Sequence, residues 1–104
     1  MKTFRKLIRD KIPEIIASNG EKAITRVLDD LEFLAALENK LLEEVQEMWA
    51  KKADKKMEIA DIYEVLDALI RAYGFSKEEI IKIQEHKHQE RGGFEKKLFL
   101  EGTE

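Results

Sequence analysis

The chain has 104 residues, a net charge of −3 and no cysteine. This length suits one domain, so we predict that residues 1–104 form a single domain. Without cysteine the chain forms neither disulfides nor thiolate sites, which favours a reducing cytoplasm. Its 39% charged residues are of both signs and form no basic block, so we expect no nucleic-acid duplex as partner. Charges at Arg9 and Asp10 interrupt any signal-peptide core, and no apolar run reaches membrane-spanning length.

Two short elements are expected before residue 29. The first helix is predicted over about Asp10 to Ala17, with Asp10 as its N-cap and Pro13 tolerated in the first turn. The Ser-Asn-Gly sequence at 18–20 ends this helix. Residues 23–28, AITRVL, are rich in β-prone side chains and predict a short strand.

Three longer helices are expected after residue 29, because a capping signal precedes each of them. Their predicted ranges are about 30–52, 55–73 and 77–90. The capping residues are Asp29 with Glu32, then Asp54, then Ser76 with Glu79. Gly74 ends the third helix of the chain, and the glycine pair at 92–93 ends the fourth.

The C-terminal segment 94–100, FEKKLFL, has an apolar residue at each end and could pair as a strand with residues 23–28. The predicted fold class is therefore all-α. We expect an antiparallel bundle of about four helices, with at most this minor two-stranded element.

Helical projection selects four acidic residues from the two central helices. At about 100° per residue, Glu44 lies on the border of the apolar stripe of its helix, and Glu47 lies just beyond that border. On the next helix, Glu58 projects inside the apolar stripe and Asp61 lies on its edge. If the two helices pack antiparallel across the short turn between them, these four carboxylates can converge.

Four close carboxylates would repel one another and would be costly to desolvate, and a divalent cation removes both objections. Oxygen ligands without cysteine or histidine suit Mg²⁺ or Mn²⁺. The alternative is ordinary solvated helix surface. In that case the acids pair with nearby lysines, among them Lys40, Lys51, Lys55 and Lys56.

These residues also carry a resemblance to a known family. The sequence EEVQE followed by EIAD resembles the E-E-x-x-E … E-x-x-D signature of the all-α nucleoside triphosphate pyrophosphohydrolases, the MazG-like superfamily. Nearly the whole chain is similar to a short branch labelled phosphoribosyl-ATP pyrophosphohydrolase-like. The similar segments are KLIRDKIPEII, RVLDD, LLEEVQE, EIADIYEVLDAL, YGFS and ERGGFEKKLFL.

The resemblance implies a Mg²⁺-dependent cleavage between the α and β phosphates of a nucleotide, which yields a monophosphate and pyrophosphate. It implies Glu44, Glu47, Glu58 and Asp61 as metal ligands, with Glu43 behind them and out of direct contact. It also suggests a site built partly from a neighbouring subunit. Non-standard nucleotides, a phosphoribosyl-ATP-like compound and ordinary deoxynucleotides all remain candidate substrates.

Two carboxylates are candidates for the catalytic base. A carboxylate that the metal does not fully engage can take the proton of the attacking water. We expect Glu47 or Glu44 in this role. Displacement at phosphorus depends mainly on positioning and charge stabilisation, which such a cluster supplies.

Several cations are candidates for binding the substrate phosphates. Lys87 continues an apolar face of the fourth predicted helix, and Arg91 extends it. The other candidates are Lys40, Arg9 and Lys6. Ordinary ion pairing is the alternative for each of them. Three aromatic residues could stack on a base, although aromatics at helical spacing more often belong to the core or to a subunit interface: Trp49, Phe33 and Tyr63.

Two other functions compete with this hypothesis. A di-iron bundle needs a Glu-x-x-His motif on each of two helices, and the chain has one, at Glu85 and His88. A non-catalytic helical interaction module would fold without metal and hydrolyse no nucleotide. Whatever its function, we expect the chain to form a homodimer or a higher homo-oligomer, because a second copy would cover the wide apolar stripe of residues 33–42.

Overall fold

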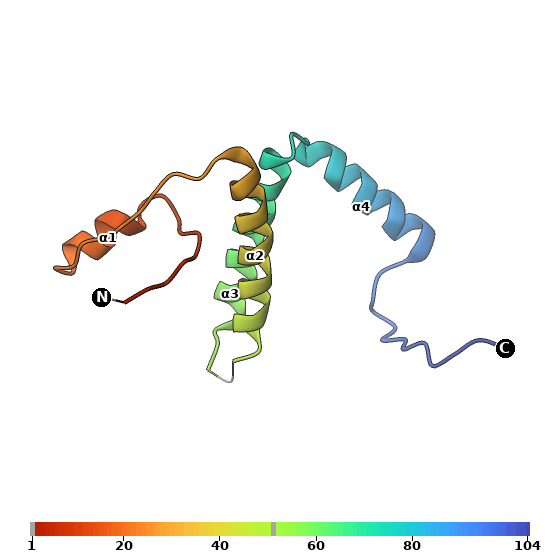
Figure 1. The fold of residues 1–104 in the computed structure, drawn as a ribbon. Coiled ribbons are helices and arrows are strands. Elements are labelled where there is room, and N and C mark those ends of the chain that lie inside the picture. Colours follow the sequence, from red (N-terminus) through yellow and green to blue (C-terminus); the bar gives the residue numbers. More distant parts are fainter. Residues whose placement is uncertain (1, 51) are drawn as a thin grey trace. The chain divides into compact units, whose positions relative to one another are not determined.

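The computed structural model describes residues 2–50 and 52–104, which are all-α (Figure 1). The helices are α1 (Ile12–Ser18), α2 (Asp30–Met48), α3 (Lys55–Ala72) and α4 (Lys77–Arg91). They belong to two compact units, Met1–Gly74 and Phe75–Glu104. The all-α class with four helices is therefore confirmed. Among the described residues, no helix is long and apolar enough to cross a bilayer.

The predicted two-stranded element is wrong, because neither 23–28 nor 94–100 forms a strand in the described parts of the chain. In the first segment, Ile24 is 79% exposed and Val27 is 97% exposed. The β preference of such side chains comes mainly from packing on a paired, half-buried surface. Here no such surface covers them, so the preference has nothing to act on.

The capping signals position the three longer helices as expected. Asp29 accepts a hydrogen bond from the backbone N–H of Glu32, and the Glu32 side chain accepts one from the backbone N–H of Asp29. Asp54 accepts from the first turn of α3, and Ser76 forms a second capping box with Glu79. Each cap satisfies backbone donors that the first helical turn leaves free.

Two helix limits differ from the prediction. Asp10 does not cap α1, because Lys11 is the residue at that position and its side chain makes no capping hydrogen bond. Helix α2 ends at Met48, four residues before the predicted limit at Lys52. The connection to α3 is therefore longer than the sequence pattern suggested. Helices α3 and α4 are followed by Gly74 and Gly92, both at positive φ, where glycine is favoured.

Helices α2 and α3 form an antiparallel hairpin, which is the centre of the first unit (Figure 1). Leu37 of α2 and Val65 of α3 are its buried apolar side chains. The Tyr73 hydroxyl, at the C-cap of α3, donates a hydrogen bond to Glu38 near the middle of α2 and ties the two helices together. The short turn after Met48 brings the end of α2 next to the start of α3, and this sets the level at which their acidic residues meet.

The cap of α2 allows a direct test. Asp29→Ala should lower the free energy of unfolding by about 1 kcal/mol, because the backbone N–H of Glu32 loses its acceptor. Asp30→Ala removes the same charge one residue later and should cost clearly less. Urea unfolding followed by circular dichroism measures both variants. Equal losses would mean that charge, and not the capping hydrogen bond, stabilises this end.

Candidate metal centre

Three carboxylates meet between α2 and α3. Each of Glu44, Glu47 and Glu58 offers one oxygen, and these three oxygens lie within 4.8 Å of one another. Glu44 and Glu47 are three residues apart, so they share one side of α2. Glu58 lies in the first turn of α3, just after the connection that reverses the chain. The structure thus brings together three of the four residues that the helical projection selected.

Burial distinguishes the three acids. Glu44 is only 6% exposed, Glu58 is intermediate and Glu47 is exposed. The Oε2 atoms of both Glu44 and Glu58 are buried and accept no hydrogen bond from any described residue. A buried polar atom without a partner is costly, and a charged one more so. Two facing carboxylates carry no donor of their own when ionised, so a shared proton or a bound cation would satisfy them.

The pKa values of Glu44 and Glu47 are both raised, the direction expected for crowded and partly desolvated acids. Burial raises the pKa of Glu44, and the charges of Asp61 and Glu58 raise it further, while Lys40 opposes them. The pKa of Glu47 is also raised, first by partial desolvation of its carboxyl and then by Glu44 and Glu43.

The fourth predicted ligand, Asp61, is bound by an arginine instead. Arg9 Nη2 donates to Asp61 Oδ1 at 2.7 Å, although 52 residues separate the two in sequence. Asp61 is one turn after Glu58, and its charge acts on Glu44, so it lies beside the cluster. It is absent from the set of three converging oxygens. Its role as a ligand therefore stays a prediction.

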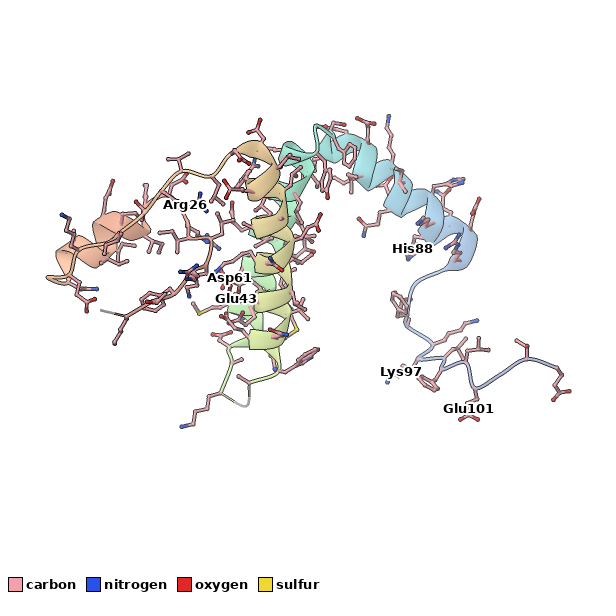
Figure 2. All side chains as sticks on the ribbon, viewed as in Figure 1. Arg26, Glu43, Asp61, His88, Lys97 and Glu101 are labelled. Carbon is pink, nitrogen blue, oxygen red and sulfur yellow. The ribbon has the colours of Figure 1, made fainter. Side chains whose placement is uncertain are left out.

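Two lysines hold the α2 side of the cluster. Lys40 Nζ lies 3.4 Å from Glu43 Oε1 and 3.5 Å from Glu44 Oε1, and its side chain is only 17% exposed. Lys6 Nζ lies 3.6 Å from Glu43 Oε1. Figure 2 labels Glu43 and Asp61 on the hairpin, and residues of the N-terminal segment pair with both. These contacts leave the Glu43 side chain half-buried.

The charges around the cluster do not cancel. Its carboxylates, with those beside it, are Glu43, Glu44, Glu47, Glu58 and Asp61. Among the described residues, the cations paired with them are Lys6, Arg9 and Lys40. When all of these described groups are ionised, five negative and three positive charges leave two negative charges, which one divalent cation would neutralise. The all-oxygen donor set and the unpartnered oxygens together fit a hard cation such as Mg²⁺ or Mn²⁺.

The other predicted site residues lie outside the cluster. Lys87 and Arg91 are exposed on α4, in the second unit, and their contact with substrate stays a prediction. Glu85 and His88 belong to no group of potential metal ligands among the described residues. Instead His86 pairs with Glu90 at 2.8 Å. These observations give the di-iron alternative no support.

The three aromatic residues that could stack on a base are not core residues of the hairpin. Trp49 is 72% exposed and Tyr63 is 63% exposed, while Phe33 is intermediate. None of the three is buried in the hairpin. Their contact with a base stays a prediction.

Comparison with known proteins gives no family. No family model matches the chain, and no solved structure matches it. A protein of Mycolicibacterium smegmatis, described as uncharacterized, is 50% identical over 44 residues. Those residues are 42% of this chain and 45% of the relative, so the chain spans less than half of the relative's length. This likeness identifies a partial relative and assigns it no activity.

Divalent cations should stabilise the protein through these carboxylates. Mn²⁺ or Mg²⁺ at about 100 times its dissociation constant should add about 2.7 kcal/mol to the free energy of unfolding. Glu58→Gln should abolish most of this gain, because it removes a charged oxygen ligand. Glu64→Gln, an equal charge change at an exposed position of α3, should keep the gain. Thermal unfolding with and without chelator measures the effect, and equal gains in both variants would exclude this site.

The raised pKa of Glu44 predicts a pH dependence in the absence of metal. The folded state holds this proton more tightly than the unfolded chain. Its contribution is complete below the unfolded pKa of about 4.3 and is lost as pH rises through the folded pKa. In chelator, Glu44→Gln should therefore gain stability relative to the wild type as pH increases, by about 1 kcal/mol at neutral pH. Urea unfolding across pH measures this difference, and a difference that does not change with pH would contradict it.

Proposed function

We propose that this protein is a metal-dependent nucleotide pyrophosphohydrolase, which cleaves between the α and β phosphates and releases a nucleoside monophosphate and pyrophosphate. The observation that carries the proposal is the pair of buried, unpartnered oxygens of Glu44 and Glu58, beside Glu47. A protein gains nothing in stability from such an arrangement alone. The arrangement becomes favourable once a hard cation occupies it, and the resemblance to MazG-like enzymes then supplies the reaction.

Each acid of the cluster has a distinct task in this proposal. Glu44 and Glu58 hold the cation, because they are the less exposed acids and their free oxygens have no other partner. A bound Mg²⁺ or Mn²⁺ would neutralise phosphate oxygens and make water a better nucleophile. Asp61 is a further ligand once its arginine is released.

Glu47 is our choice for the general base. It is exposed and reaches solvent, whereas Glu44 is buried. Its raised pKa brings it closer to the operating pH, where a carboxylate accepts a proton more effectively. Glu47 would take the proton of the attacking water while the more buried acids stay with the cation. Glu44 is the alternative that the sequence left open.

The cations beside the cluster are suited to the negative phosphates. Lys40 is held against Glu43 and Glu44 and contributes a fixed positive charge. Lys6 and Arg9 come from the N-terminal segment and can reach a ligand bound at the hairpin. Charge stabilisation of this kind supplies most of the catalysis of phosphoryl transfer.

The proposed substrate is a non-standard nucleotide or a phosphoribosyl-ATP-like compound. We place the enzyme in the cytoplasm, where a cysteine-free chain meets both nucleotides and Mg²⁺. We further propose that it acts as a homodimer or higher homo-oligomer. Large exposed apolar side chains before and within the first turn of α2 support this, because Val27 is 97% exposed and Leu31 is 81% exposed.

The same exposed side chains favour a second candidate, a non-catalytic helical oligomerisation module. In that case the hairpin would use its apolar surface to associate, and the acids would have no reaction to perform. The two candidates differ in metal dependence. A module would associate equally well in chelator and would release no pyrophosphate from any nucleotide.

A nucleotide panel tests the proposed reaction. With Mg²⁺, at least one triphosphate should yield pyrophosphate and a monophosphate, and no orthophosphate. Glu58→Gln should lower this turnover by about 100-fold or more, because removing a charge that positions the metal costs several kcal/mol. Glu64→Gln should retain wild-type turnover, and circular dichroism should show both variants helical. Full turnover in Glu58→Gln would remove the cluster from the mechanism.

A further inference from the structure

We propose that Arg9 is a mobile counter-ion that occupies Asp61 in the metal-free protein and leaves it when a cation binds. One part of this inference rests on the proposed function, namely that the released guanidinium then binds substrate phosphate. The exchange itself needs only a divalent cation at the hairpin. The exchange would make the N-terminal segment, residues 2–9, part of the site. We call this segment the N-terminal arm, and its contact with the hairpin would change when metal binds.

The pair between Arg9 and Asp61 is the shortest ion pair at the site. It spans 2.7 Å, whereas the lysine pairs span 3.4 to 3.6 Å. A charge-assisted hydrogen bond of this length is stronger than a loose ion pair. Arg9 therefore holds Asp61. Asp61 is the predicted ligand that does not belong to the cluster of three converging oxygens.

Helix geometry places Asp61 within reach of the same cation as Glu58. The two acids are three residues apart on α3, so they lie one turn apart on one face. The charge of Asp61 also acts on Glu44. A cation shared by Glu44 and Glu58 would thus sit beside Asp61, and an additional oxygen ligand would improve its coordination.

Arg9 and such a cation exclude each other. The guanidinium has no lone pair to offer a metal, and its positive charge repels a divalent ion close by. Once Asp61 turns to the cation, Arg9 Nη2 loses its acceptor. Its side chain is 57% exposed, so nothing in the described structure prevents it from moving.

The backbone keeps Arg9 near the site during this exchange. The Arg9 carbonyl accepts a hydrogen bond from the N–H of Ile12, at the start of α1. Lys6 holds the preceding part of the arm to Glu43. The guanidinium is therefore released locally, next to a cation that attracts phosphate. Arginine suits phosphate because its planar donors can contact two oxygens at once.

Mn²⁺ titration without nucleotide tests the exchange. Isothermal titration calorimetry should show about fivefold tighter Mn²⁺ binding to Arg9→Ala, because the cation no longer competes for Asp61. Arg26→Ala is the matched control, since Arg26 pairs with Glu32 at the start of α2. Its Mn²⁺ affinity should equal that of the wild type. Unchanged or weaker binding in Arg9→Ala would overturn the proposal.

A double-mutant cycle separates the specific pair from a general charge effect. In an Asp61→Asn background, Arg9→Ala should change Mn²⁺ affinity by less than about twofold, because the contested carboxylate is gone. An equal gain with and without Asp61 would show that Arg9 acts only through its charge, and would refute the exchange. Failure of every variant to bind Mn²⁺ would refute it as well.

Pyrophosphate binding tests the destination of the guanidinium. With saturating Mg²⁺, Arg9→Ala should bind inorganic pyrophosphate about tenfold more weakly than wild type, and Arg26→Ala should not differ. Equal affinity would refute phosphate capture by Arg9. The proposed function is judged separately, by pyrophosphate release from nucleotides. A protein that exchanges Arg9 for Mn²⁺ but hydrolyses nothing would retain this inference and lose the enzymatic one.

Discussion

The site depends on the repulsion between two carboxylates that face each other across the α2–α3 hairpin, each with one buried oxygen. Glu44 and Glu58 each keep one oxygen out of water and out of every described hydrogen bond. Lysine at position 40 relieves only the α2 side, through Glu43 and Glu44. The hairpin therefore holds two carboxylate oxygens that lack a partner among the described residues, and the proposed cation would supply one.

Local sequence signals were sufficient to predict where the three longer helices begin. They were insufficient to predict the structure of the segments between and beside the helices. The capping boxes at Asp29 and Ser76 act within one turn, so their outcome does not depend on distant packing. Residues 23–28 failed as a strand because β structure needs a partner that no local pattern can supply. The end of α2 was also misplaced, since continued helix propensity past Met48 competes with the reversal of the chain.

The acidic cluster could be expected from the sequence because helical periodicity and a short connection constrain it strongly. Two carboxylates three residues apart must share a side of α2, and the reversal brings Glu58 to their level. The cations of the N-terminal segment could not be paired in the same way. Arg9 meets Asp61 across 52 residues, and no periodic pattern relates the two. Its contact depends on how the segment before α1 returns to the hairpin.

The most direct measurement is anomalous diffraction at the manganese edge from crystals grown with Mn²⁺. The account predicts a manganese peak between the carboxylates of Glu44 and Glu58, in contact with oxygens of both. Crystals that contain Mn²⁺ but show these two carboxyl groups hydrogen-bonded directly to each other, with no metal between them, would contradict it.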